Sequence, residues 1–403
     1  MSRQYDIVIA GAGMVGLALA CALGNSALRV AIIEKQLFEE TAGASNYDNR
    51  VSAITMACRY FLEHIGVWSA IVQQRYHPYQ KMFIWDAVGH GELAFDCADI
   101  GEACLGYIIE NRVTQSALQQ QLRNLSNITY YEGYDITAID ELEAETVVHC
   151  HNGEALHCRL LVAADGAQSL VRQLSGISSH GWSYQQQAIV ATVETEKSHQ
   201  DTAWQRFLPS GPLAFLPLGD EYHCSIVWSI DNDKVDELHM LDDDAFCVKL
   251  QSVFDNRLGV MRSIEERKRF PLNLAHASNY VQPRLALIGD AAHRVHPLAG
   301  QGVNLGFADA ATLAEVVLDA LKNGKDIGAY NVLRRYERWR KGDNLAMLAV
   351  TDTLKRLFGT DQVLISTIRS LGMDAINAAS PVKDIIMRSA TGLSRDLPLS
   401  MRP

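Results

Sequence analysis

The sequence lacks several patterns that mark well-known classes of protein. None of its eight cysteines forms a C-x-x-C pair, so zinc ribbons and thioredoxin-like redox sites are not expected. Basic residues are too few to favour a nucleic-acid partner, because Asp and Glu outnumber Lys and Arg by 47 to 36, a formal net charge of −11. No internal repeat or low-complexity tract is present. The cysteines are best explained as reduced, mostly buried thiols of a cytoplasmic protein.

What is present is an ordinary globular composition, 48% hydrophobic and 21% charged over 403 residues. This length allows a large core and two or three intertwined modules. The uncharged stretch Ile7–Gly24 is long enough to be considered as a membrane span. Its glycines favour a strand, a turn and a helix instead, and no convincing cleavage site of a signal peptide follows it.

A Gly-rich turn near the N-terminus predicts a dinucleotide site. Gly11, Gly13 and Gly16 form a G-x-G-x-x-G motif between an expected strand, Tyr5–Ala10, and an expected helix, Leu17–Leu23. Gly11 permits the tight turn, Gly13 lets the backbone approach a pyrophosphate, and Gly16 allows close packing of helix on sheet.

The next expected strand ends in a carboxylate. Glu34 follows Leu28–Ile33, at the position where a carboxylate can accept both hydroxyls of an adenosine ribose, and Lys35 beside it is a further cofactor-binding candidate. The resulting βαβ unit implies a parallel sheet. The motif alone does not distinguish FAD from NAD, and a Gly-rich turn of an unrelated α/β protein is the alternative.

Two further Asp-containing turns follow apolar strands. Asp165 begins a D-G-x-x-S-x-x-R segment after Ala155–Ala164, and Asp290 lies in a G-D-A-A-H segment between Leu285–Ile288 and an expected helix, Val303–Leu321. Alone, each is an ordinary turn or helix N-cap. Because the two segments follow the first Gly-rich turn in this order, the three together indicate one large cofactor that is held at both ends. The position of Asp290 suits a ligand with ribityl hydroxyls and phosphates.

Hydrophobic periodicity predicts elements of both kinds along the rest of the chain. We expect helices over Val51–Ile65, Arg112–Leu122 and Asp243–Phe254, and strands over Lys81–Asp96, over Ile128–Cys150 and in most of Ser183–Phe270. From Asp326 onward the chain looks helical, and Asn344–Phe358 is amphipathic.

At the three motifs the chain resembles the class A FAD-dependent aromatic hydroxylases, the family of para-hydroxybenzoate hydroxylase. Further segments resemble the ubiquinone-biosynthesis branch: Asp48–Ile54, Glu110–Val113, Ala214–Leu218, His296–Gly306 and Asp309–Ala311. Three more, Ser225–Ser229, Phe254–Gly259 and Leu333–Arg338, are most similar to the bacterial 2-polyprenylphenol hydroxylases that act at ring carbon 5. They are less diagnostic, since relatives that act at other ring carbons share the scaffold.

The resemblance implies an α/β fold, with a Rossmann-like FAD-binding domain, an inserted β-sheet substrate domain and a helical C-terminus. We expect residues 1–75, 100–182 and 271–342 to form the FAD-binding domain, 76–99 and 183–270 the substrate domain, and 343–403 the helical region.

It also implies the roles of several residues. Arg50 and Arg112 would contact FAD, although each could be an ordinary surface ion pair. The loop with Pro297, Gly300 and Gly302 would form the catalytic wall against the isoalloxazine ring. The backbone N–H groups of the following helix, which include Gly302, Val303 and Asn304, would stabilise the anionic reduced flavin.

In the implied reaction NAD(P)H reduces FAD, and O2 then gives a flavin C4a-hydroperoxide that hydroxylates a phenol. No second G-x-G-x-x-G provides a separate NAD(P)H domain, so transient docking of NADH or NADPH near FAD is expected. His293 and His296 are candidate general bases by chemistry, but the family has no established histidine base at this place.

The implied substrate is a polyprenylphenol of ubiquinone biosynthesis, hydroxylated at C5. Its tail needs an apolar slot, to which six residues could contribute, although ordinary core is the simpler interpretation of each: Phe207, Leu213, Phe215, Leu216, Val227 and Trp228. A ubiquinone-biosynthesis complex, a homo-oligomer and peripheral contact with the inner membrane through Asn344–Phe358 stay open, although packing of that helix on its own domain is the simpler expectation.

Other functions fit the same cofactor motifs. A sibling hydroxylase acting at C1 or C6 is the nearest alternative. A flavin-dependent reductase and an FAD-bearing scaffold are more distant ones. A flavin halogenase is disfavoured, because the Trp-x-Trp-x-x-Pro segment of that class is missing.

Overall fold

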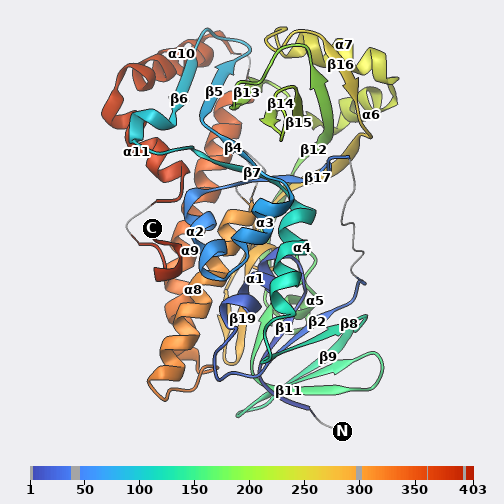
Figure 1. Ribbon diagram of the computed structural model, residues 1–403, viewed down its shortest axis with the longest axis vertical. Coiled ribbons are helices and arrows are strands. Elements are labelled where there is room, and N and C mark those ends of the chain that lie inside the picture. The colour runs from blue at the N-terminus through green and yellow to red at the C-terminus, as the bar shows by residue number, and fades with distance from the viewer. Residues whose placement is uncertain (1–2, 38–45, 296–301, 361, 394–395) are drawn as a thin grey trace.

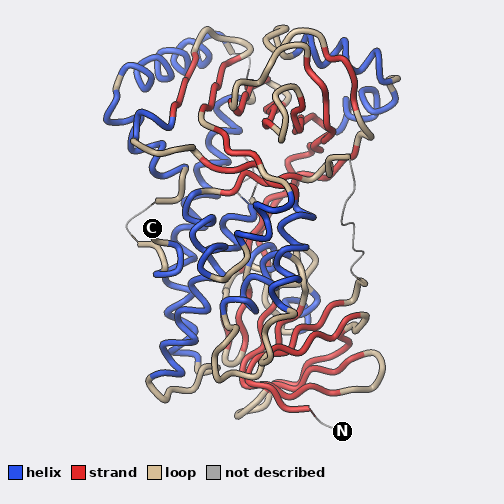
Figure 2. The backbone as a smooth tube through the Cα atoms, viewed as in Figure 1, coloured by secondary structure: helices blue, strands red, loops and turns tan. Residues whose placement is uncertain are grey.

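The structure is a computed structural model that describes residues 3–37, 46–295, 302–360, 362–393 and 396–403. Its strands form three sheets, which we call sheets A, B and C. Sheet A and sheet C lie toward opposite ends of the molecule, and long helices run between them (Figure 1). The same view coloured by secondary structure shows mixed α/β architecture with a helical C-terminal part (Figure 2). The fold class predicted from the sequence is confirmed.

Sheet A carries the first glycine turn. Its main path is β18 (Val281–Gln282), β19 (Leu285–Leu287), β11 (Ala155–Ala163), β1 (Arg3–Ala10), β2 (Val30–Glu34) and β8 (Ile128–Glu132), and β10 (Thr146–Cys150) and β9 (Ile136–Glu141) extend from β11. The pairs of β1 with β2 and β11, of β2 with β8 and of β11 with β19 are parallel. In parallel sheets the carboxyl ends of the strands share one edge. The turns after β1, β11 and β19 therefore meet at that edge.

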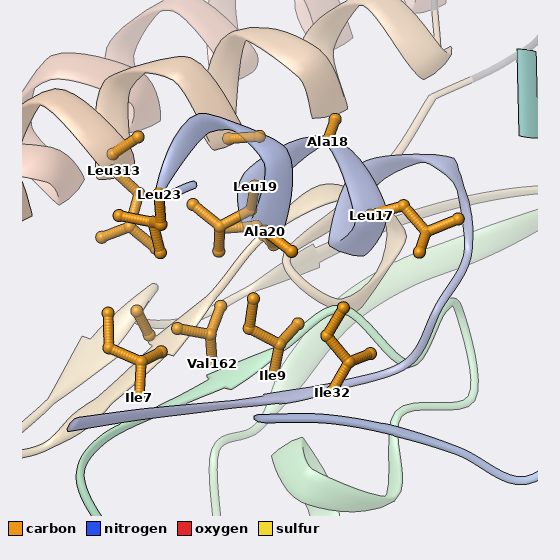
Figure 3. Close-up of a cluster of buried hydrophobic side chains, with 14 of the residues drawn as sticks. Ile7, Ile9, Leu17, Ala18, Leu19, Ala20, Leu23, Ile32, Val162 and Leu313 are labelled. Carbon is orange, nitrogen blue, oxygen red and sulfur yellow. The ribbon is translucent and has the colours of Figure 1, made fainter. Parts of the chain in front are cut away.

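The core beneath this edge lies between sheet A and α1 (Met14–Ala22). Strand side chains point toward the helix and are fully buried, as Figure 3 shows for Ile7, Ile9, Ile32 and Val162 against Leu17, Leu19, Leu23 and Leu313. Helix α8 (Gly302–Lys322) packs on the same helix. A Cβ on Gly306 would lie 2.5 Å from Val15 Cγ2, so this close approach requires a glycine.

Sheet C is the second large sheet. Its path is β20 (His293–Arg294), β17 (Lys268–Ala277), β12 (Ser179–Thr195), β15 (His223–Asp231), β14 (Gly211–Pro217), β13 (Thr202–Leu208), β5 (Lys81–Asp86) and β6 (Glu92–Asp96), and β16 (Met261–Ile264) pairs with β12. The smaller sheet B consists of β3 (Val51–Ile54), β7 (Gly106–Glu110) and β4 (His77–Tyr79). Since β5 pairs with β13, a segment from the first hundred residues belongs to sheet C.

The remaining helices surround the sheets. They are α2 (Met56–His64), α3 (Trp68–Gln74), α4 (Asn111–Leu122), α5 (Leu170–Leu174), α6 (Asn232–Met240), α7 (Asp243–Val253), α9 (Tyr330–Phe358), α10 (Val363–Ala378) and α11 (Ser380–Ala390). In the described part of the chain, short 3-10 turns are η1 (Cys97–Ile100), η2 (Gly289–Ala291) and η4 (Leu399–Met401). Helix α10 packs on β6 and α11 on η1, at the left of Figure 1.

Two expectations from periodicity need correction. The helix expected over Val51–Ile65 is wrong for its first four residues, which form β3 and pair with β7. Helix α6 was not expected. All eight cysteines lie in the described part of the chain and are free, buried thiols, as predicted.

Candidate active site

The first glycine turn has the geometry of a phosphate cradle. Gly11 has φ +100°, and a Cβ there would lie 2.5 Å from the carbonyl oxygen of Ala164. A Cβ on Gly16 would lie 2.1 Å from the carbonyl oxygen of Gly11. At Gly13, by contrast, no described atom lies within 4 Å of the Cβ position, so this glycine borders open space at the N-terminus of α1. That space is what a bound pyrophosphate requires.

Glu34 lies beside this turn. Its Oε2 accepts a hydrogen bond of 2.7 Å from the backbone N–H of Ala12, and its Oε1 accepts one of 2.9 Å from Gln36. The carboxylate is therefore held at the end of β2, where an adenosine ribose would meet it. Lys35 points elsewhere: its Nζ lies 2.7 Å from Asp135 on the surface, and its role in binding FAD stays a prediction.

The second motif is tied to the third. The Oδ2 of Asp165 accepts a hydrogen bond of 3.1 Å from Val171, while its Oδ1 is buried without a partner among the described residues. Burial raises the pKa of Asp165. Arg172 donates a hydrogen bond of 2.7 Å to the carbonyl oxygen of Ala291 in η2. The two segments predicted to hold one cofactor thus lie in direct contact, and the orphaned carboxylate oxygen fits a site that receives hydroxyl donors.

A cavity of about 420 Å³ lies between these turns and sheet C. This volume is in the usual range for small-molecule sites. Predicted site residues Gly13, Arg50, Asp290, Gly302 and Val303 all line it. The guanidinium of Arg50 lies 5.2 Å from the ring centre of Phe270, which lines the cavity as well. Predicted residues that lie far apart in the sequence, near positions 13, 50 and 290–303, are thus brought to one site.

Other predicted residues lie next to the cavity or outside the described part. Arg112 does not line it and forms an ion pair of 2.7 Å with buried Glu110, so contact with FAD stays a prediction. The side chain of Asn304 holds the end of β3, since Oδ1 accepts a hydrogen bond from Thr55 N (3.0 Å) and Nδ2 donates one to Ala53 O (2.8 Å). Pro297, Gly300 and His296 lie outside the described residues.

A buried charge network behind the third motif was not predicted. Asp309 Oδ2 lies 2.6 Å from His293 Nε2 and accepts a hydrogen bond of 3.0 Å from the backbone N–H of Gly289. Its Oδ1 accepts hydrogen bonds from Arg340 Nε (2.9 Å) and Asn344 Nδ2 (3.2 Å). The network therefore fixes the turn that carries Asp290 to α8 and α9.

The electrostatics of this network favour the ion pair. Burial alone would raise the pKa of Asp309, but His293 and Arg340 outweigh it, so the pKa is lowered and the carboxylate stays charged. His293 is buried and does not line the cavity, which gives no support to a general-base role. The signal in the sequence was Asp309 in the apolar first half of the helix 302–322, because a charge between Ala308 and Ala310 needs a buried partner.

The roof of the cavity is the face of sheet C that points toward the glycine turns. Of the six apolar candidates for the substrate slot, Leu216 and Val227 line the cavity. Leu213, Phe215 and Trp228 belong to the core on the opposite face of the sheet, and Phe207 stacks on Phe358 at 3.9 Å. Two polar residues that line the roof, Gln205 and Ser229, were not predicted.

Comparison with known proteins places the chain in a family. A family model described as "FAD binding domain" matches residues 4–345. The chain belongs to this family. It is 38% identical over 443 residues to the mitochondrial ubiquinone biosynthesis monooxygenase COQ6 of Xenopus tropicalis, covering 96% of this chain and 93% of that protein. It is 36% identical to the 3-demethoxyubiquinol 3-hydroxylase of Escherichia coli, covering 97% and 100%. Within the family it is therefore a member of the ubiquinone-biosynthesis class A flavin hydroxylases.

The fold comparison agrees with this membership. The p-nitrophenol 4-monooxygenase of Pseudomonas putida superposes with a TM-score of 0.79 at 19% identity, covering 96% of this chain and 98% of that one. The present chain is therefore an aromatic-ring hydroxylase. Its cofactor is FAD, and NAD(P)H is the reductant. Among the described residues, no helix has both the length and the apolar character needed to cross a membrane.

Proposed function

We propose that this hydroxylase adds oxygen to the ring of a polyprenylphenol in ubiquinone biosynthesis, at ring carbon 5. The observation that carries the proposal is the cavity, which has FAD-motif residues Gly13, Asp290 and Gly302 on one wall and a mostly apolar sheet on the other. An apolar roof suits a prenylated ring. The relatives named for ubiquinone biosynthesis support the pathway, and the segments that resemble C5-hydroxylases support the position.

The residues present fit the cofactor. Gly11, Gly13 and Gly16 would hold its pyrophosphate, Glu34 its ribose, and Asp165 and Asp290 its ribityl chain, with Lys35, Arg50 and Arg112 nearby. When bound and reduced by NAD(P)H, FAD supplies the activated oxygen. The protein orients the ring, keeps water away with the apolar roof, and directs the first N–H groups of α8 at Gly302, Val303 and Asn304 toward developing negative charge. The loop with Pro297 and Gly300 would complete the flavin-side wall.

A second candidate is hydroxylation of a later, methoxylated precursor at another ring carbon, because the Escherichia coli relative is named a 3-demethoxyubiquinol 3-hydroxylase. To separate the two, the purified holoprotein is supplied with NAD(P)H, O2 and either a short-chain 2-polyprenylphenol or a demethoxyquinol. NMR of the products then locates the new hydroxyl. We expect the 2-polyprenylphenol to be hydroxylated at C5 of the ubiquinone-pathway numbering, which is ortho to the phenolic hydroxyl. Turnover of the demethoxyquinol alone would move the assignment to the second candidate.

A further inference from the structure

The roof of the cavity contains a polar side chain that forms no hydrogen bond to the described part of the protein. Gln205 on β13 is only 5% exposed and lines the cavity, yet its side-chain amide forms no hydrogen bond within the described part of the chain. Buried amides in folded proteins almost always have partners, because an unpaired one is strongly disfavoured. An exception that faces a cavity indicates a group that a ligand completes.

The strand fixes the direction of this amide. Alternate residues of β13 point to opposite faces of sheet C. Arg206 points to the far face and pairs with Asp255 at 2.7 Å, which leaves Gln205 on the cavity face. Across the ladder, Gln205 is opposite Ala214 on β14 and Ile84 on β5. Ala214 also lines the cavity, and its small side chain leaves the amide accessible.

The surroundings of the amide are mostly apolar, and Ser229 is a further polar side chain of the roof. The neighbouring roof residues are Ala188, Val190, Ala214, Leu216 and Val227. A neutral amide can both accept and donate a hydrogen bond and brings no charge into this surface. The chemistry that matches it is a single neutral hydroxyl on an otherwise apolar ring, which is what a prenylated phenol presents.

We propose that the side-chain amide of Gln205 binds the phenolic hydroxyl of the substrate, with Oε1 accepting the phenolic O–H, and thereby determines which ring carbon faces the flavin-side wall. This inference rests on the proposed function, because it takes a phenol as the substrate. The hydroxyl activates the ring carbons ortho and para to itself, so anchoring its oxygen restricts the carbons that can react. Gln205 is then a specificity-determining residue. The phenol ring lies between Gln205 on the roof and Gly302 and Val303 on the opposite wall.

The test compares a phenol with its methyl ether, which cannot donate a hydrogen bond. Binding of a short-chain 2-polyprenylphenol and of its methyl ether to the oxidised holoprotein is measured through the flavin absorbance. We expect the wild type to prefer the phenol by roughly tenfold, the size of one neutral hydrogen bond. Gln205→Met keeps the volume and loses the amide, so that preference disappears and hydroxylation yields more than one regioisomer.

The matched control is Gln119→Met. Gln119 on α4 is 7% exposed, comparable to Gln205, but does not line the cavity, so this variant keeps the wild-type preference. If Gln205→Met does not retain FAD, Gln205→Leu is measured in the same way. If the wild type hydroxylates the phenol but the Gln205 variant still prefers the phenol over its methyl ether by tenfold, the role of Gln205 is overturned and the proposed function is not. A wild type that neither binds nor hydroxylates the phenol overturns the proposed function as well.

Discussion

Among single residues, Gly13 and Gly16 of the first turn differ in which atoms the methyl group of an alanine would contact. Gly13 has φ −68° and open space at its Cβ position, whereas a Cβ on Gly16 would lie 2.1 Å from a backbone oxygen. We predict that Gly13→Ala folds with a nearly unchanged melting temperature but binds FAD at least about tenfold more weakly, because the methyl group occupies the pyrophosphate's place. Gly16→Ala should destabilise the protein itself by about 1–3 kcal/mol.

Thermal unfolding of the apoproteins and FAD titration separate these two effects. The apo form of Gly13→Ala should melt with the wild type, and the apo form of Gly16→Ala should melt earlier. Unchanged FAD affinity in Gly13→Ala would show that the pyrophosphate does not approach this glycine.

The charge of Asp309 is predicted to stabilise the fold behind the Asp290 turn. Asp309→Asn keeps the shape but removes the buried carboxylate partner of Arg340 and leaves only the exposed Asp343, so we expect a loss of about 3 kcal/mol at pH 7. Since the pKa of Asp309 is lowered in the folded state, its stabilisation is complete above the unfolded pKa near 4 and is lost as the pH falls through the lower folded value.

Denaturant unfolding of both proteins over a range of pH checks this sign. The difference in unfolding free energy between wild type and Asp309→Asn should be constant from pH 7 to about 5 and should shrink below about 4. If the difference in unfolding free energy grew as the pH fell, Asp309 would not be ionised beside Arg340 in the native protein.

At the scale of elements, α10 is attached to sheet C by a buried ion pair. Asp86 at the end of β5 lies 2.5 Å from Arg369 on α10, and each side chain is 1% exposed. The pair of Asp99 with Lys383 on α11 is a partly exposed control at 3.0 Å. We predict that Asp86→Asn costs about 3 kcal/mol and speeds hydrogen exchange in α10, while Asp99→Asn costs less than about 1 kcal/mol. Equal effects of the two substitutions would contradict this account of the docking.

Elements with strong periodicity could be predicted, and weak ones could not. Helix α8 matches the expected Val303–Leu321 almost residue for residue, because its apolar face is long and continuous. Helix α6 could not be predicted from periodicity, because only Val235 and Leu238 of its nine residues are buried. The strand Val51–Ile54 has apolar spacing compatible with a helix, and pairing with β7 decides its conformation.

At the scale of the whole molecule, the site depends on contacts that local sequence does not encode. The G-x-G-x-x-G motif and the two Asp-containing motifs could be found because each has a fixed order of residues, and the parallel sheet brings their turns to one edge. Which face of a strand lines the cavity depends on the register of the sheet. Leu213 and Leu216 were therefore equally good candidates from the sequence, but only Leu216 lines the cavity. The pairing of Asp309 with Arg340 likewise requires the packing of α8 on α9. The division of the chain into domain segments stays a prediction.

We infer that the enzyme, with FAD held at this cavity, transfers one oxygen atom from O2 to a phenol ring. The most direct measurement is mass spectrometry of the product after the holoprotein, NAD(P)H and a short-chain 2-polyprenylphenol react under ¹⁸O2. We expect a product that carries one ¹⁸O atom in a new ring hydroxyl, while the other oxygen atom leaves as water. NAD(P)H consumption without a labelled product, or oxygen incorporated from water, would contradict it.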